Sequence, residues 1–149
     1  MVHERPAVEH RLEYVRTINK VEYINDSKAT NINSVIVAIN TYDRPIILIL
    51  GGFNKGANFR LLLPHIKSSH VRDIVSYGDA GGQINTALGD AVRSVQVTDL
   101  SSAVKKAHLI AQPGDIVLLS PGCASFDQFR NFEFRGDFFK AAENNLSIK

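Results

Sequence analysis

The stretch "PIILIL", residues 45–50, decides the fold class. Five isoleucine and leucine residues follow Pro45 with no polar residue among them. A strand that faces water on one side alternates apolar and polar residues, whereas a continuous apolar run is typical of a strand buried on both faces. The stretch therefore predicts a central strand of a mostly parallel sheet.

The segment before this strand predicts a helix. In "TNINSVIVAINTY", residues 30–42, four apolar residues recur at the spacing i, i+3, i+4 and i+7, which marks one face of a helix. They are Ile32, Val35, Ile36 and Ile39. Thr30 or Asn31 is expected to cap its amino end. A helix thus precedes the buried strand and can cover one face of the sheet.

The same alternation continues to the end of the chain. We expect helices at 59–66 (interrupted by Pro64), 79–88, 100–111 and 127 to about 144, with strands at 71–78, 92–99 and 116–120. Two short alternating runs at 12–17 and 21–25 predict a hairpin-like strand pair at the amino end. Strands that alternate with helices indicate an α/β fold with a mostly parallel sheet covered by helices on both faces.

Composition restricts the classes of partner. The 149 residues are 44% hydrophobic and 21% charged, with a net charge of +2 and one cysteine. One domain is expected at residues 10–149, after a linker-like segment at 1–9 that suggests a piece of a longer protein. The small charge gives no reason to expect nucleic acid or a membrane as partner. The single cysteine indicates a reducing, cytoplasmic location.

The loops that follow the strands are the expected ligand site. In open parallel sheets, ligands bind at the carboxyl ends of the strands. These ends carry the loops 25–31, 51–59, 76–82, 98–102 and 120–129, and four of the five are rich in Gly, Ser, Asn or Asp. Anion-binding or catalytic residues are therefore expected in these loops.

The loop "GGFNKGANF", residues 51–59, is not a phosphate-binding P-loop. Gly51 and Gly56 have the P-loop separation, but Ala57 and Asn58 stand where lysine and serine or threonine are needed. No other strand is followed by a dinucleotide-binding glycine pattern. The chain is thus expected to lack a triphosphate cradle of its own. Lys55 either faces water or points its ammonium group at an anion.

Two further loops have both an ordinary and a functional interpretation. The polar residues of "NDSKATN", 25–31, cap the following helix or bind an anion with it. In "SPGCASFDQF", 120–129, free N–H groups near Ser125 to Asp127 are expected at the start of the last helix, where they would either be capped or bind a carboxylate. Cys123 is expected to be a buried small residue rather than a nucleophile.

Aromatic residues and histidines add little evidence of chemistry. Six of the eight phenylalanines lie between Phe126 and Phe139, and most are expected in the core, with Phe132 bordering a ligand. The five histidines show no metal-ligand spacing and are expected at the surface. Arg11 is expected at the surface or against a partner domain or a phosphate.

Four motifs in order resemble the C-terminal domain of the Mur ligases, and specifically its D-glutamate-adding branch. They are "HRLE" (10–13), "DSKATN" (26–31), "LGGFNKGANF" (50–59) and "LLSPGCASFDQFRNFEFRGDFF" (118–139). The resemblance covers about residues 9 to 146. It implies a Rossmann-like domain that binds D-glutamate and closes on a central domain, which holds ATP and Mg²⁺. A further domain would bind UDP-N-acetylmuramoyl-L-alanine, the acceptor in peptidoglycan precursor synthesis.

The resemblance also implies roles for individual residues. Those implied to contact D-glutamate are Thr30, Lys55, Ser125 and Phe132. Those implied to reach the nucleotide are Arg11 and Asp26, with Lys28 and Asn31 as neighbours in the same loop. No residue receives a definite catalytic role, and no metal ligand is implied. Without a P-loop, the chain is expected to be inactive alone and monomeric, as an excised or separately encoded domain.

Two other functions remain open at this point. The chain could be a stand-alone nucleotide- or anion-binding module that uses the same loops without ligase chemistry. It could also belong to a related ligase with another amino acid as substrate. A purely structural domain is the remaining alternative.

Overall fold

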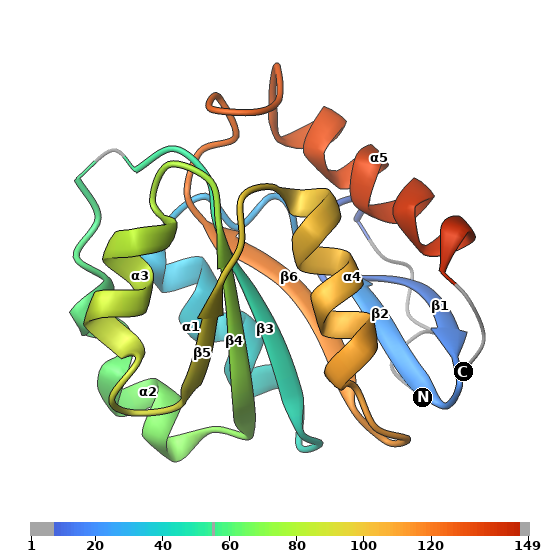
Figure 1. The fold of residues 1–149 in the computed structure, drawn as a ribbon, viewed down its shortest axis with the longest axis horizontal. Coiled ribbons are helices and arrows are strands. Elements are labelled where there is room, and N and C mark those ends of the chain that lie inside the picture. Colours follow the sequence, from blue (N-terminus) through green and yellow to red (C-terminus); the bar gives the residue numbers. More distant parts are fainter. Residues whose placement is uncertain (1–7, 55, 147–149) are drawn as a thin grey trace.

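The computed structural model describes residues 8–54 and 56–146. A six-stranded sheet with the order β1-β2-β6-β3-β4-β5 forms its centre (Figure 1). The strands are β1 Glu13–Ile18, β2 Val21–Asn25, β3 Ile46–Gly51, β4 Val71–Tyr77, β5 Arg93–Gln96 and β6 Ile116–Gly122. β1 pairs antiparallel with β2, and the other neighbours pair parallel. The predicted hairpin and parallel sheet are therefore confirmed; the linker expected at residues 1–9 lies mostly outside the described residues.

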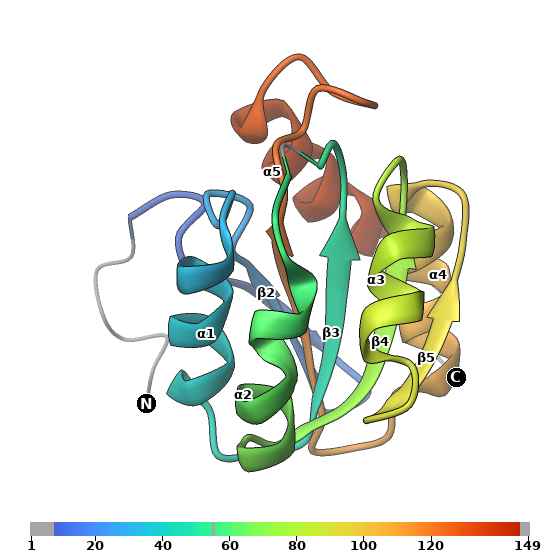
Figure 2. The ribbon, with the colours of Figure 1, turned by 90° about the vertical axis from the view of Figure 1, so that its left-hand side faces the viewer.

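Helices cover both faces of the sheet, as the alternating pattern predicted. They are α1 Ile32–Thr41, α2 Leu63–Ser68, α3 Gly81–Leu88, α4 Leu100–Ile110 and α5 Phe132–Ala142, with short 3-10 turns at Phe59–Leu62 and Glu143–Asn145. Figure 2 shows α1 and α2 on one side of the sheet and α4 on the other. In the described part of the chain, no helix is both long and apolar enough to span a bilayer.

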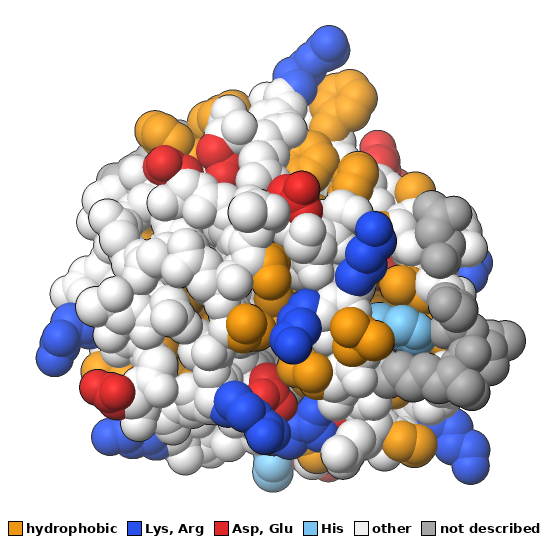
Figure 3. All heavy atoms as spheres, viewed as in Figure 1, with side chains coloured by type: hydrophobic (Ala, Val, Ile, Leu, Met, Phe, Trp, Pro, Cys, Tyr) orange, Lys and Arg blue, Asp and Glu red, His pale blue; other side chains and the backbone are white. Residues whose placement is uncertain are grey.

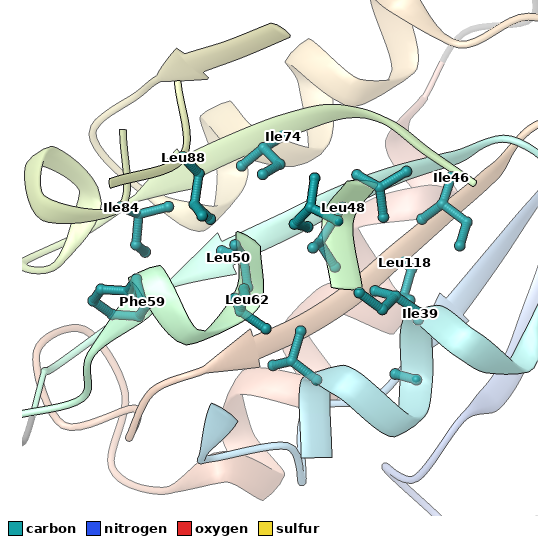
Figure 4. Packing of buried hydrophobic residues seen from close by; sticks show 14 of the residues in the cluster. Ile39, Ile46, Leu48, Leu50, Phe59, Leu62, Ile74, Ile84, Leu88 and Leu118 are labelled. Atoms are coloured by element: carbon teal, nitrogen blue, oxygen red, sulfur yellow. The ribbon is translucent and has the colours of Figure 1, made fainter. Parts of the chain in front are cut away.

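The strand that decides the fold lies in the middle of the molecule. All residues from Ile46 to Leu50 are fully buried. Ile46, Leu48 and Leu50 pack into the cluster that contains the apolar faces of α1, α2 and α3 (Figure 4). Ile47 and Ile49 point to the opposite face and pack with α4 and Phe139. Both faces of β3 are thus in a core, which explains why its sequence has no polar residue.

Local signals placed several element ends correctly. Asn31 caps α1, because its side chain accepts a hydrogen bond from the Ser34 N–H at 2.9 Å. Asp99 caps α4 in the same way. Pro64 lies in the first turn of α2, where its missing N–H costs nothing. The expectation that Pro64 interrupts a helix at 59–66 was therefore wrong, because a 3-10 turn occupies Phe59–Leu62 and α2 begins at Leu63.

The prediction for the last helix was wrong at its start. We expected it to begin at Asp127, but α5 begins at Phe132 with Asn131 as its cap. The side chain of Asn131 accepts a hydrogen bond from the Phe134 N–H at 2.9 Å. Residues 123–131 instead form a turning segment, the β6–α5 connection, which runs from the end of β6 to the cap of α5.

The expectation that most of the clustered phenylalanines lie in the core was also wrong. Of the six, only Phe139 is fully buried, while Phe126, Phe134 and Phe138 are 60%, 49% and 39% exposed. The buried face of α5 is made by Arg135, Gly136 and Phe139. The other rings therefore lie on the flanks or outside. Phe129 packs on Phe138 with 5.4 Å between ring centroids.

An apolar groove of about 720 Å³ lies between α4 and α5. It is lined mainly by alanine, valine, leucine and phenylalanine side chains, with Lys105 and His108 among them. In the space-filling view of this face, apolar side chains lie among lysines and arginines (Figure 3).

Candidate functional site

Loops from five strands meet at the carboxyl edge of the sheet, at the top of Figures 1 and 2. Backbone hydrogen bonds join them directly. The Gly122 N–H donates to the Ala29 carbonyl and the Phe53 N–H to the Ala124 carbonyl, both at 2.8 Å. The Ala80 N–H donates to the Gly52 carbonyl at 2.9 Å. The predicted ligand loops therefore form one continuous surface.

A first cleft of about 390 Å³ opens between three of these loops. Thr30, Asn31 and Asn33 line it from the start of α1, opposite residues 56–58 and 122–124. The first N–H groups of a helix have no carbonyl one turn earlier, and they carry partial positive charge. The first cleft can therefore accept a carboxylate at the start of α1, with the exposed Thr30 hydroxyl beside it.

The loop after β3 is shaped by an asparagine. Asn54 Oδ1 accepts hydrogen bonds from the N–H groups of Gly56 at 2.9 Å and Ala57 at 2.7 Å. The Asn54 amide also donates to Gln83 at the start of α3. Lys55, the predicted anion-binding lysine, lies outside the described residues. Its neighbour Gly56 lines the first cleft.

A second cleft of about 280 Å³ lies on the other side of the 25–31 loop. It contains Arg11, Asp26 and Lys28, together with Ser34 and Val37 of α1. The residues implied to contact the nucleotide thus gather in this cleft, while Thr30 and Asn31 line the first. Two exposed cations beside a buried carboxylate form a surface suited to phosphate groups.

Asp26 is buried and anchored at both carboxylate oxygens. Oδ1 accepts a hydrogen bond from the Leu12 N–H at 3.1 Å, and Oδ2 accepts one from the Ser120 hydroxyl at 2.8 Å. Burial raises the pKa of Asp26 to about 6, against the opposing effects of Ser120, Leu12 and the Arg11 charge. The carboxylate is therefore mainly ionised at neutral pH.

We expect Asp26→Asn to flatten the pH dependence of stability between pH 4 and 6. A folded-state pKa raised from 3.8 to about 6 means that the folded protein holds the proton more tightly than the unfolded chain. The stability from this group is therefore complete below pH 4 and is lost as the pH rises to 6, by about 3 kcal/mol. The asparagine amide keeps an acceptor for Leu12 and gains a donor for Ser120, but it does not titrate.

Urea unfolding at half-unit steps from pH 4 to 7 measures this effect. The free energy of unfolding should fall across this range in the wild type by more than in Asp26→Asn. Asp90→Asn is the matched control, because Asp90 is exposed and its substitution should leave the wild-type slope intact. Parallel curves for wild type and Asp26→Asn would contradict the assignment.

Ser125 and Phe132 lie beside the first cleft in sequence but outside its lining. Ser125 is buried, and its carbonyl accepts hydrogen bonds from the N–H groups of Gln128 at 3.1 Å and Phe129 at 2.8 Å. These bonds form a turn, so the expected helix start at Ser125 to Asp127 is absent. Phe132 is half-buried, with its ring edge-on to His10 at 6.1 Å between centroids.

The sequence interpretation missed a buried arginine beneath these loops. Arg135 is fully buried. Its Nε donates to Ser27 Oγ at 2.9 Å, Nη1 to the Cys123 carbonyl at 2.9 Å and Nη2 to the Ser27 carbonyl at 2.7 Å. Ser27 Oγ in turn donates to the Phe132 carbonyl at 2.7 Å. Arg135 therefore joins the 25–31 loop, the β6–α5 connection and α5.

His10 was expected at the surface and is instead buried. Its Nδ1 accepts a hydrogen bond from the Asn25 amide at 2.9 Å, so its Nε2 carries the proton when the ring is neutral. His10 packs on Gly136, where an added Cβ would collide with Nδ1. The small residue after Arg135 was the one local sign that a second chain segment approaches α5 closely.

Among the described residues, Glu9, His10 and Asp137 form one group with metal-binding distances, which the histidine spacing did not indicate. The Lys140 ammonium group lies 2.8 Å from Glu9 and 3.9 Å from Asp137. These carboxylates are therefore already paired with a cation. Cys123 is buried, as expected, and burial raises the pKa of its thiol to about 12, which makes it a poor nucleophile.

Comparison with known proteins identifies the family of the chain. The family described as "Mur ligase, glutamate ligase domain" matches residues 10–123. The chain is 50% identical to the UDP-N-acetylmuramoylalanine--D-glutamate ligase of Chlamydia caviae over 131 residues, covering 88% of this chain and 31% of the relative. It is 49% identical to the ligase of the same name from Clostridioides difficile, covering 93% of this chain and 31% of the relative.

Solved structures share the fold at low identity. A murein peptide ligase from Psychrobacter arcticus superposes with a TM-score of 0.66 and 13% identity, covering 95% of this chain and 31% of that one. A UDP-N-acetylmuramate-alanine ligase from Thermotoga maritima gives a TM-score of 0.60 at 11% identity, covering 95% of this chain and 31% of that one. The chain spans about a third of the length of the relatives it matches. It belongs to the Mur ligase family and is a C-terminal, glutamate ligase domain of that family.

Proposed function

We propose that this chain is the D-glutamate-presenting domain of the ATP-dependent ligase that adds D-glutamate to UDP-N-acetylmuramoyl-L-alanine in peptidoglycan precursor synthesis. The observation that carries the proposal is the 49–50% identity to D-glutamate ligases over about nine-tenths of the chain. The first cleft supports it, because a hydroxyl and helix N–H groups can bind a carboxylate there.

Each implied residue has a place in the proposed reaction. Thr30, Lys55, Ser125 and Phe132 contact D-glutamate, with Ser125 and Phe132 largely near its carboxylates. Such binding holds the amine where it can attack an acyl phosphate, which ATP forms on the acceptor carboxylate. The new C–N bond forms as phosphate leaves, and the amine loses a proton. The domain contributes positioning and charge stabilisation.

The nucleotide would be contacted from the second cleft. Arg11 and Lys28 supply cations for phosphate groups, and Asp26 supplies a nearby acceptor. Magnesium fits less well, because both Asp26 oxygens already accept hydrogen bonds and the Glu9–Asp137 pair holds Lys140. We therefore assign the metal to a central ATP-binding domain. The assembled ligase is proposed to be monomeric and cytoplasmic.

An amide NMR titration of the chain with D-glutamate and then L-glutamate tests the proposal. We expect shifts near Thr30, residues 56–58 and 122–125, and Phe132, larger for the D isomer. Equal responses to both isomers would contradict the assignment of D-glutamate. Binding of ATP with no response to either isomer would favour a nucleotide-binding module, and preference for another amino acid would favour a related ligase.

Lys55→Ala should reduce kcat/KM for D-glutamate about 100-fold in the assembled ligase, because it removes the cation proposed to face a substrate carboxylate. Steady-state kinetics with saturating ATP and acceptor measure this loss. Lys67→Ala is the matched control, since Lys67 is exposed on α2 away from both clefts. Activity of Lys55→Ala within a few-fold of wild type at equal stability would refute the role of Lys55.

A further inference from the structure

The β6–α5 connection, residues 123–131, is fixed to the ends of three other strands. The Ala124 carbonyl accepts a hydrogen bond from Phe53 in the loop after β3. Further along, two consecutive side chains, Asp127 and Gln128, bond to the loops after β4 and β5. Since Ser125 lies between these attachments, they fix the segment of backbone that carries its side chain.

Asp127 forms the attachment to the loop after β4. Its Oδ2 accepts a hydrogen bond from the Asp79 N–H at 3.1 Å. The same oxygen lies over Gly78, where an added Cβ would collide with it. Gly78 has φ +74°, a conformation that favours glycine, so the residue provides both the turn and the room for the carboxylate.

The second oxygen of Asp127 faces inward. Oδ1 is buried and makes no hydrogen bond within the described residues. The negative charge of Asp127 is one of several influences that raise the pKa of Arg135, while burial lowers it by more. The carboxylate of Asp127 thus lies close enough to the buried guanidinium for the two charges to attract each other.

Gln128 forms the attachment to the loop after β5. Its Nε2 donates to the Thr98 carbonyl at 3.0 Å, and its Oε1 accepts from the Leu100 N–H at 3.4 Å. The Gln128 N–H itself donates to the Ser125 carbonyl. Asp127 and Ser125 therefore lie in the same hydrogen-bonded turn, so a displacement of Asp127 should also displace Ser125.

We propose that Asp127 is a positioning residue for the amino-acid site. The Asp127 carboxylate lies over Gly78 and accepts a hydrogen bond from the Asp79 N–H, and this contact holds the nearby Ser125 in place. This inference rests on the proposed function, in which Ser125 binds a carboxylate of D-glutamate. Asp127 does not itself touch the substrate. Its loss should therefore weaken the use of D-glutamate specifically and leave the nucleotide side unchanged.

Steady-state kinetics of the assembled ligase test the proposal. Asp127→Ala should raise KM for D-glutamate about 10- to 100-fold, because small displacements of binding groups have effects of this size. The KM for ATP and the kcat at saturating D-glutamate should stay close to wild type. Asp127→Asn should restore a near-wild-type KM, since its amide oxygen still accepts from Asp79. Asp90→Ala, at an exposed carboxylate outside the connection, is the matched control.

Two further measurements separate positioning from general destabilisation. The Asp79 amide should exchange with solvent faster in Asp127→Ala but not in Asp127→Asn. Gly78→Ala should also raise KM for D-glutamate, because its added Cβ would displace the Asp127 carboxylate and strain the turn at φ +74°.

The outcomes distinguish this inference from the proposed function. If the wild-type ligase uses D-glutamate and Asp127→Ala keeps its KM, Asp127 does not position the site. If Asp127→Asn is as impaired as Asp127→Ala, the hydrogen bond to Asp79 is not the cause, and the inference is also wrong. If the wild-type ligase does not use D-glutamate at all, the proposed function fails and the inference falls with it.

Discussion

Replacing Arg135 by methionine should lower the free energy of unfolding by about 3–5 kcal/mol. The guanidinium donates three hydrogen bonds, to Ser27 Oγ, the Ser27 carbonyl and the Cys123 carbonyl. A hydrogen bond to a charged group contributes about 1.5–3 kcal/mol net, and a buried acceptor left without a donor costs about 1–3 kcal/mol. Methionine fills part of the volume but donates nothing.

The burial of the guanidinium opposes this loss but does not cancel it. No carboxylate within the described residues forms a salt bridge with Arg135. Burial lowers its pKa, yet an arginine remains protonated at neutral pH because its ordinary pKa is far above 7. The charge is thus solvated by backbone carbonyls in place of water. Removing it leaves the Ser27 and Cys123 carbonyls without this donor, between the 25–31 loop, the β6–α5 connection and α5.

Chemical denaturation of wild type and Arg135→Met measures the effect. Arg130→Met is the matched control, because Arg130 is exposed in the same region and stacks on Phe134 at 5.0 Å, a contact that contributes about 0.5–1 kcal/mol. Arg135→Lys should lie between the two, since an ammonium group keeps the charge without the planar fork. A loss below 1 kcal/mol in Arg135→Met would show that the loops hold their places without the guanidinium.

The sequence predicts the elements whose own pattern decides them. The continuous apolar run of β3 and the spacing of apolar residues in α1 required no knowledge of distant contacts. The start of α5 could not be predicted in this way. Residues 127–130 have no strong helix breaker, but the side chains of Asp127 and Gln128 bond to loops about 30 to 50 residues earlier in the chain. Tertiary contacts thus delay the helix until the local cap at Asn131.

The candidate site also contains residues that the local sequence predicts and residues that it does not. Thr30, Asn31, Arg11 and Asp26 follow or precede strands at positions that the topology brings to one edge, so the loops they occupy could be predicted. The buried Arg135 and His10 could not, because arginine and histidine are usually exposed or partly exposed. Their burial depends on partners from three segments that no local pattern identifies.

Glu143→Met should raise the free energy of unfolding, and the gain should grow with pH. Glu143 follows α5 and is 1% exposed. Neither of its carboxyl oxygens makes a hydrogen bond within the described residues. Burial raises its pKa to about 8, against the smaller opposing effects of its own backbone N–H and of the Arg16 charge. Glu143 also helps to raise the pKa of Tyr23, after burial, so the two groups lie in one buried region.

The raised pKa of Glu143 decides whether stability rises or falls with pH. The folded protein holds the Glu143 proton more tightly than the unfolded chain, whose glutamate has a pKa near 4.5. The stability from this group is therefore complete below pH 4.5 and is lost as the pH rises through 8, by about 5 kcal/mol at most. Methionine has a similar length and no ionisable group, so it should remove this loss.

Unfolding free energies from pH 5 to 9 test this prediction. The variant should be more stable than wild type by about 3–5 kcal/mol at pH 9 and by much less at pH 5, where the acid is neutral in the folded state. Glu133→Met is the matched control, because Glu133 is exposed in the first turn of α5. It should cost less than about 1 kcal/mol, without changing the slope between pH 5 and 9. Parallel curves for wild type and Glu143→Met would mean that Glu143 gains solvent or a partner when it ionises.

A domain of this size has a total stability of about 5–15 kcal/mol. A loss of the expected size would make Glu143 the main cause of weakening in alkaline solution, and the single substitution should reverse it.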